Sequence, residues 1–277
     1  MSIFLPHYKK GFIALPDGAQ VPYVIVGNGP RKRVVLPGAG DGLSMVSSAA
    51  PNLAFHFRRQ AKRYRILLLS RRHPLPLGHS FSQQAADTVY AMERLGFGGS
   101  ILECNSAGGP IGQCIAVSRP DLVAGLVLSV TLHRSNPHTS KVVSDWLTMI
   151  HENKGSELLW NTMELSFRPK TLARYRMLKP LLPLMLPAAK NFERLQHLLL
   201  ELLDFDHSSL LGQISCPTLV SGGEDDRIVP AAIQREMAAL IPGAELQLFP
   251  GYGHGNDQEN PEYLKSLDRF AEQLPRV

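Results

Sequence analysis

Short apolar runs alternate with amphipathic runs along most of this 277-residue chain, and this alternation limits the possible folds more than any other feature. Residues 64–69 are almost continuously apolar, as in a strand that is buried on both faces. Residues 83–95 instead place Ala86, Val89 and Met92 at helical spacing. The repeated alternation predicts an α/β fold with a mostly parallel central sheet and helices on both faces.

The alternation covers two stretches and is absent between them. The expected strands are 11–15, 21–26, 33–36, 64–69, 100–103, 122–130, 217–221 and 245–249, and the expected helices 52–63, 83–95, 109–117, 231–240 and 261–274. Between them, the stretches 142–150, 155–165, 171–178 and 192–203 all have helical character. We therefore expect one α/β core, residues 1–133 and 208–277, interrupted by a helical insertion at 134–207.

The charge pattern argues against a nucleic-acid partner. Lys and Arg total 29 and Asp and Glu total 24, which gives a formal net charge of +5. A nucleic-acid-binding protein concentrates basic residues in a stripe, whereas here they are scattered, with the densest groups at 31–33, 58–63 and 71–72. We expect these groups to be surface charges and residues that flank strands.

Cysteine usage and hydropathy indicate the cellular compartment. The chain has three cysteines, Cys104, Cys114 and Cys216, too few for a disulfide framework and too far apart for a paired metal site. The chain starts without a secretory leader pattern, and it has no run of ~18 apolar residues that could span a membrane. We expect a cytoplasmic protein without a metal, a cofactor or a membrane span.

Ser106 is the first residue with a chemical signature. It follows an apolar strand and precedes Ala107 and Gly108, where a helix is expected to begin. A serine on a sharp strand-to-helix turn needs small neighbours, and its hydroxyl then lies at a helix N-terminus that stabilises negative charge. The usual pattern is G-x-S-x-G, and Cys104 stands here in place of the first glycine.

Three further loops follow predicted strands. Residues 37–42 are rich in glycine and can present a backbone N–H to an oxyanion. Asp226 lies in an acidic turn, and His254 lies between two glycines. Each loop alone has an ordinary explanation as a turn or as solvated surface. Together they place Ser106, Asp226 and His254 at the carboxyl ends of separate strands, where an α/β sheet carries its site.

With these residues the sequence resembles the α/β-hydrolase superfamily over essentially its whole length. The most family-like stretches are 105–120 around the serine and 217–230 around the acid. The resemblance implies an α/β-hydrolase fold whose cap is the helical insertion 134–207. The pair Pro37-Gly38, where members of this superfamily often have His-Gly, departs from the pattern.

The resemblance also implies a role for each site residue. Ser106 would be the nucleophile, His254 the general base and acid, and Asp226 the acid that orients the histidine. The backbone N–H groups of Ala39 and Ala107 would form the oxyanion hole.

These roles predict a carboxylesterase, a serine hydrolase that cleaves a small, largely apolar carboxylic ester through an acyl-enzyme. Its partner would be that small-molecule ester; the sequence indicates no oligomeric state. Two alternatives stay open. The same triad could act on a lactone, thioester, amide or C–C bond, or the fold could serve a non-enzymatic small-molecule receptor or regulator.

Five residues are candidates for substrate contact. Met149, Trp160, Met163 and Met185 belong to the apolar side chains of the insertion, some of which should line a pocket beneath a cap. Arg71 follows a predicted strand and could bind a substrate carboxylate.

Overall fold

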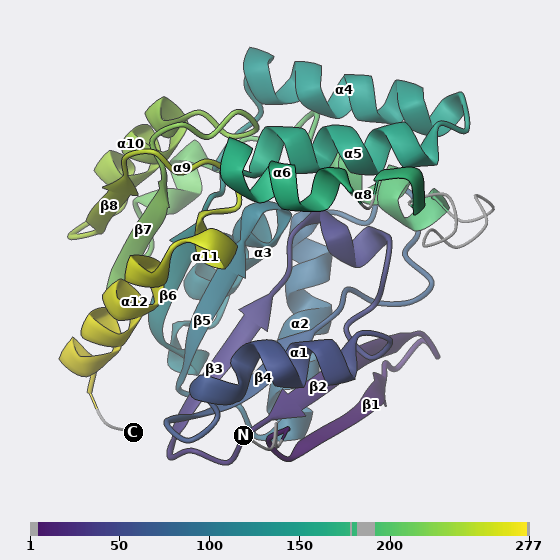
Figure 1. Ribbon diagram of the computed structural model, residues 1–277. Helices are drawn as coiled ribbons and strands as arrows, with labels where there is room; N and C mark the ends of the chain where they lie inside the picture. The colour runs from purple at the N-terminus through teal and green to yellow at the C-terminus, as the bar shows by residue number, and fades with distance from the viewer. Residues whose placement is uncertain (1–4, 178, 182–191, 276–277) are drawn as a thin grey trace.

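A single sheet of eight strands forms the centre of the computed structural model, which describes residues 5–177, 179–181 and 192–275 (Figure 1). The strands are β1 (Tyr8–Ala14), β2 (Gln20–Val26), β3 (Arg31–Leu36), β4 (Tyr64–Leu69), β5 (Ser100–Asn105), β6 (Val123–Ser129), β7 (Thr218–Gly223) and β8 (Glu245–Phe249). They lie in the order β1-β2-β4-β3-β5-β6-β7-β8. The pairs β1–β2 and β2–β4 are antiparallel, and every other neighbouring pair is parallel. The prediction of a mostly parallel sheet is confirmed.

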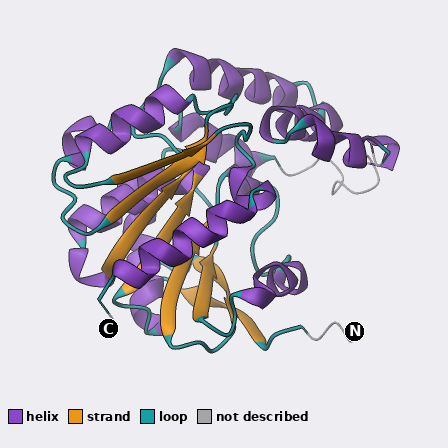
Figure 2. Cartoon of the chain, turned by 60° about the vertical axis from the view of Figure 1, so that its left-hand side comes forward, coloured by secondary structure: helices purple, strands orange, loops and turns teal. Residues whose placement is uncertain are grey.

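Helices cover both faces of this sheet (Figure 2). The core helices are α1 (Ala50–His56), α2 (Phe81–Leu95), α3 (Gly109–Ser118), α9 (Ser208–Leu211), α10 (Ala231–Leu240), α11 (Asn256–Glu259) and α12 (Pro261–Gln273). Figure 1 shows α1 and α12 in front of the sheet and α2 and α3 behind it. The predicted helix 52–63 is shorter than expected, because α1 ends at His56 and a 3-10 turn, Phe57–Arg59, follows.

Two apolar clusters hold these layers together, one on each face of the sheet. In β4, Ile66 and Leu68 belong to the cluster that includes α1 and α12, whereas Leu67 and Leu69 belong to the cluster with α2, α3 and α10. Successive side chains of a strand point to opposite faces. A strand covered on both faces is therefore apolar at nearly every position, which explains the continuous apolar run at 64–69.

Capping residues set the ends of α2. Ser80 accepts a hydrogen bond from the Gln83 backbone N–H, and the Gln83 side chain accepts one from the Ser80 N–H. This reciprocal pair satisfies two otherwise unpaired donors, so the helix begins two residues earlier than predicted. It ends at Gly96, whose φ of 72° suits glycine and terminates the helix.

The helical segment, residues 134–207, lies between β6 and β7 in the sequence. It contains α4 (Pro137–His151), α5 (Gly155–Ser166), α6 (Pro169–Arg176), a 3-10 turn η5 (Lys179–Leu181) and α8 (Glu193–Glu201). Figure 1 shows these helices beyond the edge of the sheet at which the parallel strands end. Within the described part of this segment the helices are joined by loops, and the one β-type pairing is an isolated bridge between Arg134 and Asp206.

That bridge brings the two ends of the helical segment side by side. The Ser135 N–H donates to the Phe205 carbonyl at 2.9 Å, and the His207 N–H donates to the His133 carbonyl at 2.8 Å. The chain therefore leaves the core and re-enters it at one place. None of the helices that the structure describes is both long and apolar enough to cross a membrane.

Two arginines of the basic groups are buried, so the prediction of a surface charge is wrong for them, although Arg71 flanks β4 as expected. Arg33 is 1% exposed and Arg71 is 5% exposed. The Arg33 Nε donates to Glu103 at 2.6 Å, and the Tyr263 hydroxyl donates to the same carboxylate at 2.6 Å. A buried charge needs such partners because burial removes its hydration.

Candidate active site

Ser106 occupies a strained turn directly after β5. Its φ is 50°, in the left-handed region that side chains other than glycine rarely adopt. A 3-10 turn, η3 (Ser106–Gly108), then leads into α3. A Cβ on Gly108 would lie 2.5 Å from the Leu36 carbonyl oxygen of β3. A side chain at 108 is therefore excluded, and the short turn projects Ser106 from the carboxyl edge of the sheet.

Cys104 has an equally local explanation. A Cβ on Gly112 of α3 would lie 2.2 Å from the Cys104 Sγ, so the glycine on the helix provides the space that the cysteine on the strand fills. Gly112, one helical turn after Gly108, thus provides the room for the Cys104 side chain that replaces the first glycine of the G-x-S-x-G pattern.

A chain of hydrogen bonds connects Ser106, His254 and Asp226, which come from the ends of β5, β8 and β7. The His254 Nε2 lies 2.9 Å from the Ser106 Oγ, and its Nδ1 lies 2.9 Å from the Asp226 Oδ2. The other Asp226 oxygen accepts the N–H groups of Ile228 at 2.8 Å and Val229 at 2.9 Å. These bonds fix the carboxylate, so the structure brings the three predicted residues together in the predicted order.

The environment of His254 favours its protonated form. Burial alone would lower the pKa of the imidazole, but the charge and hydrogen bond of Asp226, with a smaller effect of Asp257, raise the pKa above its ordinary value of 6.5. A histidine with these partners can accept the proton of the serine and is stabilised once it is charged.

The glycine-rich loop after β3 lies against Ser106. We call residues 37–42 the oxyanion loop; it ends in a 3-10 turn, η1 (Ala39–Gly42). A Cβ on Gly38 would lie 3.0 Å from the Ser106 Cβ and 3.5 Å from its Oγ, so this loop packs closely against the serine. The 3-10 turn that begins at Ala39 also contacts the 3-10 turn that contains Ser106 and Ala107.

The hydroxyl of Thr131 orients the peptide group that joins Ser106 to Ala107. The Thr131 Oγ1 donates to the Ser106 carbonyl oxygen at 2.6 Å. That carbonyl and the Ala107 N–H belong to one trans peptide group and point in opposite directions. Thr131 thus fixes the direction of the Ala107 N–H, a contact that no sequence motif indicated.

Helix ends of the helical segment hold the loops that carry Asp226 and His254. We call residues 224–230 the acid loop and 250–255 the histidine loop. At the start of α4, the Thr139 hydroxyl donates to the Ile228 carbonyl of the acid loop at 2.8 Å. At the end of α5, the Ser166 carbonyl accepts the Gly255 N–H at 2.9 Å. A Cβ on Gly255 would lie 2.6 Å from the Phe167 ring. The glycine after His254 therefore permits this close approach.

The third contact of the helical segment is with the oxyanion loop. The Arg194 guanidinium, at the start of α8, donates to the Asp41 carboxylate at 2.7 Å and to the Asp41 carbonyl at 3.1 Å. A Cβ on Gly42 would lie 2.7 Å from the Leu195 Cα. Each of the three loops beside Ser106 is thus in contact with a different helix end of residues 134–207.

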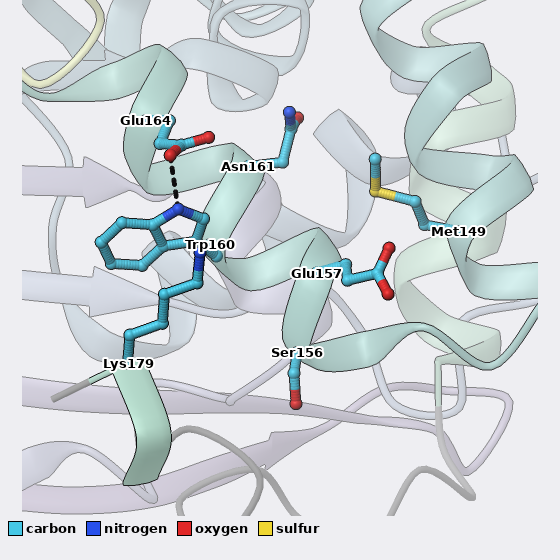
Figure 3. A pocket seen from close by; sticks show the side chains of 7 residues that line it. All are labelled: Met149, Ser156, Glu157, Trp160, Asn161, Glu164 and Lys179. Carbon is cyan, nitrogen blue, oxygen red and sulfur yellow. Dashed lines mark hydrogen bonds between the residues drawn. The ribbon is translucent and has the colours of Figure 1, made fainter. Parts of the chain in front are cut away.

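Two of the predicted substrate contacts line a cavity inside the helical segment (Figure 3). Its volume is about 300 Å³, and its lining residues are Met149, Ser156, Glu157, Trp160, Asn161, Glu164 and Lys179. Most of these side chains are polar, and neither Ser106 nor His254 is among them. Met163 lies on α5 outside this lining, and Met185 lies outside the described residues.

Arg71 points into the protein. Its guanidinium donates to the side chain of Gln84 and to three backbone carbonyls. Arg71 therefore contacts the loop after β3 and the turn after Ser106, whereas the sequence predicted a contact with a substrate carboxylate. In the part of the chain that the structure describes, no group of three His, Cys, Asp or Glu side chains is arranged to hold a metal ion.

The fold and the serine turn together define a class of α/β proteins whose site lies at the carboxyl ends of parallel strands. The chain belongs to the alpha/beta hydrolase family, whose sequence model matches residues 34–266, and it is a hydrolase. It is 29% identical to a protein of Klebsiella pneumoniae subsp. pneumoniae named "Putative carbamate hydrolase RutD". The alignment of 206 residues covers 73% of this chain and 77% of that protein.

Solved structures share the fold at lower identity. MGS-M2, an alpha/beta hydrolase enzyme from a Medee basin deep-sea metagenome library, superposes with a TM-score of 0.82 at 19% identity over 95% of this chain and 98% of that chain. The enol-lactonase from Burkholderia xenovorans LB400 has a TM-score of 0.76 at 19% identity over 95% and 100% of the two chains. These similarities establish the architecture.

Proposed function

We propose that the protein is a carboxylesterase-type serine hydrolase that cleaves a small, largely apolar carboxylic ester through an acyl-enzyme. The observation that carries this proposal is the hydrogen-bonded chain from Ser106 through His254 to Asp226, with 2.9 Å at each step. A serine hydroxyl is a weak nucleophile at neutral pH, and this arrangement provides the base that activates it.

The proposed reaction has two halves. The His254 Nε2 takes the proton of the Ser106 hydroxyl while the oxygen attacks the ester carbonyl, and Asp226 stabilises the imidazolium. The N–H groups of Ala39 and Ala107 stabilise the tetrahedral oxyanion, at ~3–4 kcal/mol for one donor. Collapse of the intermediate expels the alcohol, which receives the proton from His254. His254 then activates water, which attacks the acyl-enzyme and releases the acid.

We also propose that the core comprises residues 1–133 and 208–277 and that the helical segment is a cap. The paired ends of the segment and its position beyond the carboxyl ends of the strands support this division. The substrate would be a small molecule, with Met149 and Trp160 as proposed contacts. The three cysteines are free, which is consistent with the proposed cytoplasmic location.

Carbamate hydrolysis is the second candidate. It is favoured by the 29% identity to the protein named "Putative carbamate hydrolase RutD". A carbamate differs from an ester by a nitrogen on the acyl carbon, so the same serine, base and N–H donors would serve both substrates. The two candidates differ in the acyl side that the cap must accommodate.

Labelling with a fluorophosphonate tests the mechanism common to both candidates. We expect one adduct per chain at Ser106, located by peptide mass spectrometry, and no adduct in the Ser106→Ala variant. p-Nitrophenyl esters of increasing chain length should give a burst of chromophore followed by steady turnover. A higher kcat/KM for a matched aryl carbamate would favour the second candidate. An unlabelled wild-type protein would exclude the serine mechanism.

A further inference from the structure

We propose that Arg71 is a positioning residue that fixes the two backbone N–H donors of the oxyanion hole, an inference that rests on the proposed function. Arg71 lies two residues after the end of β4, and its side chain is 3% exposed. It reaches the two neighbouring strand ends, because β4, β3 and β5 are adjacent in the sheet.

The contacts of one guanidinium span both walls of the proposed hole. The Arg71 Nη1 donates to the carbonyls of Pro37 at 3.2 Å and Gly38 at 3.3 Å, both in the oxyanion loop. The Arg71 Nη2 donates to the Ala107 carbonyl at 2.8 Å, in the turn that follows Ser106. A single rigid group thus sets the spacing between the oxyanion loop and the serine turn.

The direction of the Ala39 N–H follows from the bond to Gly38. The Gly38 carbonyl and the Ala39 N–H belong to one trans peptide group, in which the two bonds point in opposite directions. Holding the carbonyl toward Arg71 therefore turns the N–H away from it. On the other wall, Ala107 is fixed on both sides, by Arg71 at its own carbonyl and by Thr131 at the preceding one.

The guanidinium is itself held in place. Its Nε donates to the Gln84 side chain at 3.0 Å, and Asp41 lies 3.5 Å from its Nη1. Arg194 of α8 donates to the Asp41 carboxylate at 2.7 Å and to the Arg71 carbonyl at 2.9 Å. Burial lowers the pKa of Arg71 to about 10, against the opposing effect of Asp41, so the group stays charged at neutral pH.

An arginine suits this position better than a lysine. The guanidinium is a planar fork of five donors, whereas an ammonium is a point charge on a flexible stem. A lysine at 71 would keep a cation beside Asp41 but could not hold the Gly38 and Ala107 carbonyls together. The Arg71→Lys variant therefore separates the positioning of these carbonyls from the positive charge beside Asp41.

The test compares Arg71→Lys and Arg71→Gln with the matched control Arg72→Lys. Arg72 is the neighbouring arginine, and its side chain pairs with Asp17 and Asp87, away from the oxyanion loop. We expect kcat for a p-nitrophenyl ester to fall about 10-fold in Arg71→Lys and about 100-fold in Arg71→Gln, against 10²–10³-fold for complete loss of one donor. KM should change less than about twofold, because the N–H groups act on the transition state. The control should retain wild-type kcat.

A second measurement does not depend on turnover. The Ser106 oxygen adds to the carbonyl carbon of an alkyl trifluoromethyl ketone, its proton passes to His254, and a tetrahedral oxyanion forms, whereas the matched methyl ketone binds as a neutral ground-state analogue. We expect the Ki of the fluorinated ketone to rise by the same factor as kcat/KM falls, and that of the methyl ketone to stay constant.

Each result decides between two explanations. Unchanged kcat and unchanged fluorinated-ketone Ki in Arg71→Lys, in a wild type that a fluorophosphonate labels at Ser106, would overturn the role of Arg71 alone. An equal loss of affinity for both ketones would show a merely structural role and overturn it too. A wild type without labelling would overturn the proposed function and this inference with it.

Discussion

The α/β core and the helical segment contribute to the site in different ways. The core carries Ser106, Asp226 and His254, each within five residues of the end of a strand. The helical segment carries none of the three, yet its helix ends contact all three loops around the serine. The core thus determines which groups meet, and the segment determines how the loops that bear them are held.

The contacts differ in strength as well. The core positions its groups through short covalent connections to a hydrogen-bonded sheet. The segment acts through side-chain and backbone contacts between separate elements, such as Thr139 with Ile228, Phe167 with Gly255 and the ion pair of Arg194 with Asp41. Removal of Ser106, His254 or Asp226 should therefore cost most of the activity, whereas a change in a segment contact should reduce activity by degrees.

The largest expected effect is that of Ser106→Ala. Removing the hydroxyl removes the proposed nucleophile, so kcat for a p-nitrophenyl ester should fall by at least ~10⁴-fold. The melting temperature, followed by circular dichroism, should stay close to the wild-type value, because the methyl group fits where the Cβ already lies. Full activity in this variant would contradict the assignment of the site to the core.

An intermediate effect is expected for Gly255→Ala. The backbone φ of Gly255 is −82°, which alanine adopts freely, but its Cβ would lie 2.6 Å from the Phe167 ring. The histidine loop must then shift, and kcat/KM should fall roughly 10-fold because small displacements of a catalytic group are costly. Steady-state kinetics with the same ester measures this.

A double variant isolates the contact. Phe167→Ala in the Gly255→Ala background removes the ring and should restore kcat/KM to within about threefold of wild type, a non-additive result expected of residues in contact. Gly212→Ala is the control, since its Cβ would have no heavy atom within 4 Å. If the ring deletion restores nothing, the segment does not position the histidine loop.

The smallest effect concerns pH. His254 must be neutral to act as the proposed base, so its raised pKa means that kcat/KM should fall with decreasing pH around a midpoint above 6.5. The charge of Asp257 contributes to that raised pKa. Asp257→Asn should move the midpoint down by roughly a few tenths of a pH unit, since one weak charge interaction is removed.

The exposed Asp145, which pairs with Lys141 on α4, supplies the control for this shift. Asp145→Asn should leave the pH profile unchanged. An upward shift of the pH midpoint in Asp257→Asn would contradict the inference that the Asp257 charge raises the pKa of His254.

The sequence was most informative where one local pattern determines one structure. The apolar run at 64–69 predicted β4, with both ends correct, because burial on both faces requires apolar side chains throughout. The predicted site residues Ser106, Asp226 and His254 follow β5, β7 and β8 closely, and parallel topology brings such ends to one edge.

The supporting contacts had no local signal. Arg71 and Arg194 are 123 residues apart, and their joint contacts with Asp41 depend on how α8 packs against the oxyanion loop. Arg33 likewise reads as a surface charge, since no periodic pattern reveals the Glu103 and Tyr263 side chains that bury with it. Pairing between distant polar groups is a property of tertiary packing and leaves no short motif.

The bridge between Arg134 and Asp206 joins the two ends of the helical segment, and we therefore expect this segment to be exchangeable. Where a chain leaves and re-enters a domain at adjacent points, a different insert can replace the original without stretching the domain. A transplanted module should nevertheless keep the contacts with Ile228, Gly255 and Asp41, which hold the loops around the site. Chimeras that replace residues 134–207 should therefore be designed from these three contacts outward, with the remaining surface of the segment free to vary.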